Sequence, residues 1–167
     1  MNKNKLFVPL FFLITGFLIA DPPNWDANGD GVLDNFNDYE NNGSITAMVS
    51  VDGVASYAED GDMIAAFFGD EQRGVGVASL VPFGPYQGTY QFQMMIYSNE
   101  VEGETLTFQF YDQSANSVYY LSETMEFTAN MTIGNVVSPY IFIFNPGSGD
   151  IFGCMDENAC ANYDPNA

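Results

Sequence analysis

The residues best suited to chemistry lie near the N-terminus, where carboxylates and amides recur at short, regular intervals. Residues 26–38 read DANGDGVLDNFND and fit the series D-x-N-x-D-G-x-x-D-x-x-N-D. Calcium takes about six to eight oxygen ligands. A loop with side-chain oxygens at its first, third and fifth positions and glycine at its sixth wraps those oxygens around one point. The spacing therefore predicts a calcium-binding loop with Ca²⁺ as its cofactor.

The expected ligands follow from the loop positions. They are the side chains of Asp26, Asn28 and Asp30, the backbone carbonyl of Val32, the side chain of Asp34 directly or through water, and Asn37 with Asp38 at the end. The last position departs from the helix-flanked loop, which has a bidentate glutamate there. Leu33 is expected to turn inward. The alternative is an Asn/Asp/Gly-rich linker whose side chains form Asx turns.

This stretch resembles the calcium loops of dockerins and of thrombospondin type 3 repeats, in which D-x-D-x-D-G-x-x-D-x-x-D-N recurs. The resemblance covers residues 26–38 only, and no amphipathic helix follows it. What it implies is bound calcium with a structural role.

The elements that must position this loop show the period of β-strands. Between residues 89 and 112 apolar side chains alternate with polar ones, first at 90, 92, 94 and 96 and then at 106, 108 and 110. Because successive side chains of a strand point to opposite faces, this pattern predicts two long antiparallel strands that form a central hairpin. A hairpin alone is marginal and needs a second apolar layer.

The remaining strands are expected to supply that layer. They are predicted at 45–51, 62–68, 73–80, 118–121, 123–128 and 139–144. About eight short strands joined by turns, with no convincing helix, predict an all-β fold. We expect an antiparallel β-sandwich of jelly-roll type. In the turn after residue 68, Arg73 is expected to pair with Asp70 and to hold several carboxylates together.

The first twenty residues are typical of a secretory signal peptide. Lys3 and Lys5 precede an uncharged run over 6–20 that is short for a membrane span. We therefore expect a secreted or cell-surface protein that has no membrane contact after cleavage of residues 1–20. The full sequence has a net charge of −19. Cleavage would remove Lys3 and Lys5 and leave Arg73 as the only Lys or Arg of the remaining sequence. Such a surface excludes nucleic acid as a partner.

Composition divides the rest of the chain into further segments. We expect an acidic calcium-loop segment at 21–42, the β-sandwich at 43–145, a linker at 146–152 and a Cys/Asp-rich stretch at 153–167. Cys154 and Cys160 are disulfide candidates in an oxidising compartment, either with each other or with a later partner.

Two further resemblances concern these segments. Residues 153–167 look like the start of the repeat G-C-x-D-x-x-A-C-N-Y-D-P-N-A found in large secreted bacterial proteins, with Ala161 inserted, which implies a fragment of a longer chain. Residues 42–144, with DGDMIAAFFGDEQRGVG and YLSETMEFTANMTIG, resemble an uncharacterised β module of secreted multidomain bacterial surface proteins. That resemblance implies location and modularity, and it supplies no activity.

Catalysis is the function class that the sequence favours least. The chain has no histidine, which excludes Ser-His and Cys-His nucleophile systems and the common zinc sites. Among its many acids, no spacing marks a catalytic pair. We therefore expect no enzyme.

Two binding classes remain. One is a calcium-binding structural or adhesive module of a larger extracellular protein, whose partners are other surface proteins or glycans. The other is a carbohydrate-binding module that uses exposed aromatic rings. Phe83 and Tyr86, on a proline-rich loop at 81–88, are possible sugar-stacking residues or, alternatively, lids on the core. The further aromatic candidates are Tyr57, Tyr97, Tyr119 and Tyr120.

Overall fold

The structure, a computed structural model, describes residues 22–51 and 54–144. Its elements, in chain order, are η1 (Phe36–Asp38), β1 (Asn41–Val51), β2 (Val54–Ala55), β3 (Met63–Phe68), β4 (Glu71–Leu80), β5 (Tyr90–Ser98), β6 (Glu102–Asp112), β7 (Ser117–Thr128), β8 (Thr132–Ile133) and β9 (Tyr140–Phe144). The all-β class is confirmed. Within the described ranges, the one helical element is the short 3₁₀ turn η1.

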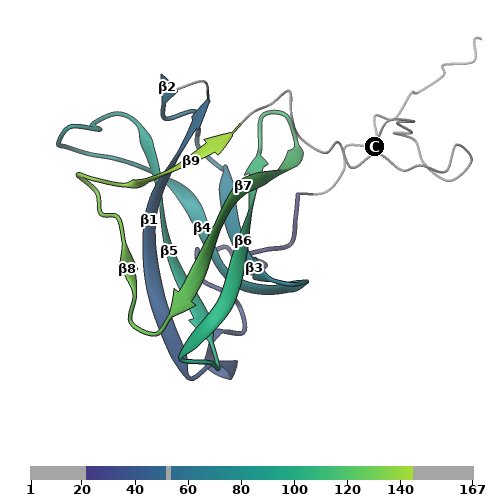
Figure 1. The fold of residues 1–167 in the computed structure, drawn as a ribbon. Helices are drawn as coiled ribbons and strands as arrows, with labels where there is room; N and C mark the ends of the chain where they lie inside the picture. The colour runs from purple at the N-terminus through teal and green to yellow at the C-terminus, as the bar shows by residue number, and fades with distance from the viewer. Residues whose placement is uncertain (1–21, 52–53, 145–167) are drawn as a thin grey trace, which may run out of the picture.

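The strands form a single mixed sheet that curls into a nearly closed barrel (Figure 1). The order is β2-β1-β5-β4-β3-β6-β7, and β8 and β9 add to β1 as parallel partners. The two layers expected of a sandwich are therefore opposite walls of one sheet. Where β7 approaches β9, the backbone N–H of Ile143 donates to Oε1 of Glu123 at 2.7 Å. A side chain thus bridges the seam of the barrel.

The main core lies inside the barrel and is rich in aromatic rings. The largest fully buried side chains include Phe92 on β5, Phe108 and Phe110 on β6, and Phe142 on β9. Phe108 and Phe142 lie 4.7 Å apart between ring centroids. The inward positions of β4 are small, and a Cβ on Gly74 would overlap the carbonyl oxygen of Met95. Glycine is therefore required where β4 passes close to β5.

The alternation over 89–112 predicted the buried faces correctly, but the predicted hairpin is wrong. β5 pairs with β1 and β4, whereas β6 pairs with β3 and β7. The two strands stand on opposite walls, and Phe92 meets Phe110 across the core at 6.2 Å. The reason is that a period of two specifies which face is buried and leaves the neighbouring strand unspecified.

Other boundaries differ in detail. The two strands expected over 118–128 are one strand, β7, with an irregular register where it pairs with β6. β1 begins at Asn41, two residues inside the predicted acidic segment. The short strands β2 and β8 were not predicted. The predicted signal peptide, linker and Cys/Asp-rich stretch, with Cys154 and Cys160, lie outside the described residues. Within the described part of the chain, no helix is long and apolar enough to cross a lipid bilayer.

A second, smaller apolar cluster lies on the outside of the barrel. Trp25, from the N-terminal segment, packs against Ala65 and Val75 of the sheet and meets the ring of Phe67 edge-on at 6.0 Å. Its backbone carbonyl accepts a hydrogen bond from Nε2 of Gln72 at 2.8 Å. The N-terminal acidic segment therefore packs against the barrel and is not a free extension of it.

Candidate functional site

The predicted calcium loop is a tightly turned segment organised around one carboxylate. Oδ1 of Asp26 accepts N–H bonds from Gly29 and Asp30 at 3.0 and 3.1 Å, and its Oδ2 accepts one from Gly31 at 2.8 Å. Both glycines have a φ of +76°, a conformation that residues with a Cβ rarely adopt. Glycine at these two positions thus lets the backbone fold over the Asp26 side chain.

The side chains of Asn28, Asp30 and Asp34 also accept hydrogen bonds from backbone N–H groups of this loop. Oδ1 of Asn28 accepts from the N–H of Asp30, and Oδ1 of Asp30 accepts from the N–H of Val32, both at 2.9 Å. Oδ2 of Asp34 accepts from the N–H of Ala27 at 3.2 Å, which ties the two ends of the loop together. Oxygen acceptors from the first, third, fifth and ninth positions therefore take part in one local network.

Two hydrophobic anchors hold this loop on the barrel. Trp25 precedes it and Leu33 lies within it, and the side chain of Leu33 is buried as expected, with 3% exposure. After the loop, the ring of Tyr39 stacks on Tyr97 of β5 at 6.3 Å, and Phe36 contacts the same ring at 5.8 Å. The loop is therefore fixed at both ends to the outer face of the sheet.

The carboxylates of the loop do not gather around a common centre. Over residues 22–51 and 54–144, no three Asp, Glu, Cys or His side chains converge closely enough to hold a metal ion. Asn37 and Asp38 are exposed in η1, one turn beyond the rest of the series. The donor set is nevertheless all oxygen, which is the chemistry that calcium prefers.

The aromatic candidates are dispersed over several elements. The side chain of Phe83 is 69% exposed on the β4–β5 loop, whereas Tyr86 on the same loop is half-buried. Tyr97 is covered by the N-terminal segment, and Tyr119 packs on Phe144 at 4.6 Å. Tyr120, on β7, is exposed. Phe83 is therefore the strongest of these candidates for contact with a ligand.

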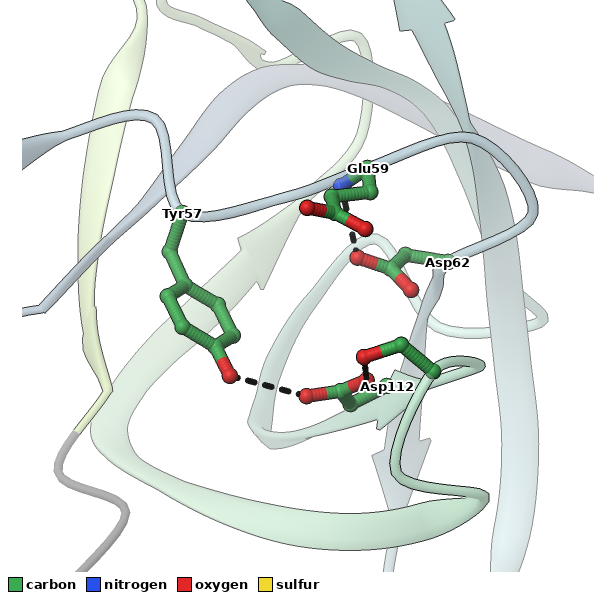
Figure 2. Close-up of a pocket in the computed structure, with 5 residues that line it drawn as sticks. Tyr57, Glu59, Asp62 and Asp112 are labelled. Atoms are coloured by element: carbon green, nitrogen blue, oxygen red, sulfur yellow. Dashed lines mark hydrogen bonds between the residues drawn. The ribbon is translucent and has the colours of Figure 1, made fainter.

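The structure also reveals a pocket that the sequence did not predict (Figure 2). Its volume is about 60 Å³, and its lining residues are Tyr57, Glu59, Asp62, Asp112 and Ser114. Asp62 and Asp112 are almost fully buried, with 2% and 3% exposure. Asp62 immediately precedes β3 and Asp112 ends β6, and because these two strands pair with each other, the topology brings the two side chains together.

Every carboxylate oxygen of the two buried aspartates has a protein partner. Asp62 accepts from the backbone N–H groups of Glu59 and Gln113 at 2.8 and 2.9 Å. Asp112 accepts from the hydroxyl of Tyr57 at 2.9 Å and that of Ser114 at 2.8 Å. The network ties the β2–β3 connection to the β6–β7 turn. The sequence signal that could have revealed it is an Asp beside turn formers at both places, with Gly61 before Asp62 and Ser114 after Asp112.

The two buried aspartates of the pocket have pKa values that are shifted in opposite directions. Burial raises the pKa of Asp62, and the neighbouring charge of Asp112 adds to the effect. Burial alone would also raise the pKa of Asp112, but bonds from Ala115, Ser114 and Tyr57 outweigh it and leave that pKa below its ordinary value. Burial together with the Asp112 carboxylate raises the pKa of Tyr57 to about 12. The hydrogen bonds that Asp112 accepts therefore favour its carboxylate form, whereas burial of Asp62 disfavours its charged form.

We expect these shifts to make the protein less stable in strong alkali. The unfolded chain releases the Tyr57 proton near pH 10, whereas the folded protein keeps it to about pH 12. The folded state therefore binds more protons in this window, so the free energy of unfolding falls as pH rises from about 10 to about 12, and the contribution of Tyr57 is constant below it. Burial raises the pKa values of Tyr39, Tyr97 and Tyr111 in the same direction.

Urea unfolding at a series of pH values tests this expectation. Tyr57→Phe removes the titrating hydroxyl and should flatten the slope, leaving only the part due to the other tyrosines. An equal slope in the parent protein and in Tyr57→Phe would contradict the assignment.

Comparison with known proteins finds no match: no family model, no curated protein and no solved structure is similar to this chain.

Proposed function

We propose that this chain is a secreted or cell-surface module of a larger extracellular protein, in which calcium bound by the N-terminal loop stiffens a β-barrel with a structural and adhesive role. The observation that carries the proposal is the Asp26 network, in which a glycine-turned loop folds over one carboxylate and presents further oxygens from alternate positions. Such a spacing suits the coordination of calcium.

The packing of the loop gives calcium a way to affect the whole domain. The buried side chains of Trp25 and Leu33 anchor the loop, and the ring of Tyr39 stacks on Tyr97 of β5 beyond it. Calcium would have to draw the carboxylates of Asp26, Asp30 and Asp34 together and so fix the backbone between the two anchors. A ligand that binds only the folded state stabilises it by mass action.

Export is supported by the signal-like residues 1–20 and by the acidic charge of the chain. High net charge keeps a protein soluble and favours association with cations. Extracellular calcium sites typically have dissociation constants of about 10⁻⁴ to 10⁻³ M. A site of this kind would be occupied wherever calcium is at millimolar levels.

Calcium is expected to stabilise the protein and to lose this effect when the loop is altered. At a calcium concentration of about 100 times the dissociation constant, the free energy of unfolding should rise by about 2.7 kcal/mol. Asp30→Ala removes one predicted ligand and should abolish most of the gain. The measurement is thermal and urea unfolding, in calcium and in EDTA, followed by circular dichroism.

Asp70→Ala is the matched control, because it removes an exposed acid from the β3–β4 turn, outside the loop. It should keep the full calcium effect. If calcium leaves the unfolding of the parent protein unchanged, the proposed site does not exist.

A further inference from the structure

Two neighbouring loops project from the barrel, on the left of Figure 1. They are the β4–β5 loop, 81–89, and the β8–β9 loop, 134–139, and we call them the loop pair. A Cβ on Gly84 would lie 4.0 Å from Cγ1 of Val137, and Nε2 of Gln91 donates to the carbonyl of Val136 at 3.0 Å. The two loops therefore touch each other.

The loop pair differs in charge from the rest of the chain. Residues 74–99 and 127–144, which contain both loops and the strands beside them, include no Asp, Glu, Lys, Arg or His, although the chain carries 22 acids. Large apolar side chains are exposed here at Leu80, Phe83 and Val137, with 58%, 69% and 61% exposure. An uncharged apolar surface on a strongly acidic chain favours a neutral partner, because anionic partners are repelled and cationic ones are drawn to the acidic faces.

The loop that carries Phe83 is held in place by its own hydrogen bonds. Val81 and Thr89 bond at 2.8 Å across its base, and the hydroxyl of Thr89 donates to the carbonyl of Tyr86 at 2.7 Å. The N–H of Gly88 adds a bond to the carbonyl of Val81 at 3.0 Å. Because these hydrogen bonds already order the loop, it loses little conformational entropy when the Phe83 ring contacts a ligand.

Next to the loop pair, at the start of β5, lies a buried acceptor that has no hydrogen-bond partner. The side chain of Gln91 is 1% exposed, its Nε2 is bonded to Val136, and its Oε1 has no hydrogen-bond partner. A buried acceptor of this kind is stabilised by any hydroxyl donor that reaches it. Sugars combine an apolar ring face, which stacks on an aromatic ring, with many hydroxyl donors and no charge.

We propose that the loop pair is a binding site for a neutral polysaccharide, with Phe83 stacking on a sugar ring and Gln91 as a hydroxyl acceptor. This inference rests on the adhesive role proposed above and names the partner class for it. Neither Phe83 nor Gln91 belongs to the calcium loop, so the two sites can fail independently.

The test is affinity electrophoresis of the full chain in gels that contain soluble neutral polysaccharides of glucose, mannose or xylose units, followed by calorimetry on those that retard it. We expect at least one neutral polysaccharide to bind and an anionic one, alginate, not to bind. Phe83→Ala should weaken binding by about tenfold or more. Gln91→Met, which keeps the side-chain volume but removes the acceptor, should weaken it by a smaller factor.

Phe36→Ala is the matched control, because it removes an exposed phenylalanine from the N-terminal segment and should leave polysaccharide binding unchanged. Circular dichroism establishes that each variant is folded.

The inference is overturned if no neutral polysaccharide binds, or if Phe83→Ala binds as the parent does. It is equally overturned if Phe83 supports only self-association in sedimentation velocity or only binding to phosphatidylcholine vesicles. If the parent protein shows the calcium effect but binds no neutral polysaccharide, this inference fails and the proposed calcium site stands.

Discussion

Replacing Arg73 with methionine is expected to destabilise the protein by about 3 to 5 kcal/mol, the usual cost of leaving a buried charge without its partner. The guanidinium of Arg73 bonds Oε1 of Glu104 at 2.7 Å and Oε1 of Glu71 at 3.0 Å. The Arg73 and Glu104 side chains are both more than nine-tenths buried. Methionine fills the space of the aliphatic stem but leaves the Glu104 carboxylate in an apolar site.

The surroundings of Arg73 add to this effect. Its guanidinium lies 5.0 Å from the ring centre of Tyr39 and 5.6 Å from that of Phe68, distances at which a cation is attracted to an aromatic face. The Tyr39 hydroxyl also donates to Glu71 at 2.7 Å. Arg73 therefore joins β4, the start of β6 and the N-terminal segment at one point.

Urea unfolding of three variants separates the buried pair from the exposed one. Glu71→Gln should cost less than about 1 kcal/mol, because Glu71 is largely exposed. The double variant Arg73→Met with Glu104→Met should recover much of the loss, since it removes both buried charges together. If the double variant is as unstable as Arg73→Met alone, the uncompensated Glu104 carboxylate is not the cause.

The sequence predicted the role of Arg73 but not its partner. We expected a pair with Asp70 in the turn, together with a wider set of carboxylates. The ion pairs go to Glu71 and Glu104, the latter 31 residues away. The register between β3 and β4 shifts so that Gln72 pairs with Phe67 and Gly74 with Ala66, which leaves Arg73 as the extra residue of a bulge. A bulge re-aims a side chain, and no local pattern encoded it.

The same limit applies to the fold and the candidate sites. Alternation along 89–112 predicted which side chains are buried, because that depends on each strand alone. Strand order depends on contacts distant in sequence, such as the parallel pairing of β9 with β1. The spacing typical of a calcium loop could be recognised in the sequence because its candidate ligands all lie within residues 26–38. The pocket of Asp62 and Asp112 was not, because its residues meet only through the pairing of β3 with β6.

The other large expected effect concerns Trp25, which anchors the acidic loop on the outside of the barrel. Trp25→Ala should lower the free energy of unfolding by about 3 kcal/mol, since it removes a large buried ring and leaves a cavity. Trp25 is 9% exposed and packs against Ala65, Val75 and Phe67. Phe36→Ala, on the same segment but 40% exposed, should have a much smaller effect.

The same variant tests how calcium would act on the barrel. If the loop stiffens the domain through its packing, an undocked loop binds calcium without stabilising the sheet, so Trp25→Ala should lose most of the calcium-dependent gain in unfolding free energy. Trp25 is the single tryptophan of the chain, so its fluorescence in the parent protein reports on the docked segment as calcium is added. If calcium raises the free energy of unfolding of Trp25→Ala as much as that of the parent protein, its effect does not depend on the packing of Trp25. The stiffening of the barrel through this anchor would then be contradicted.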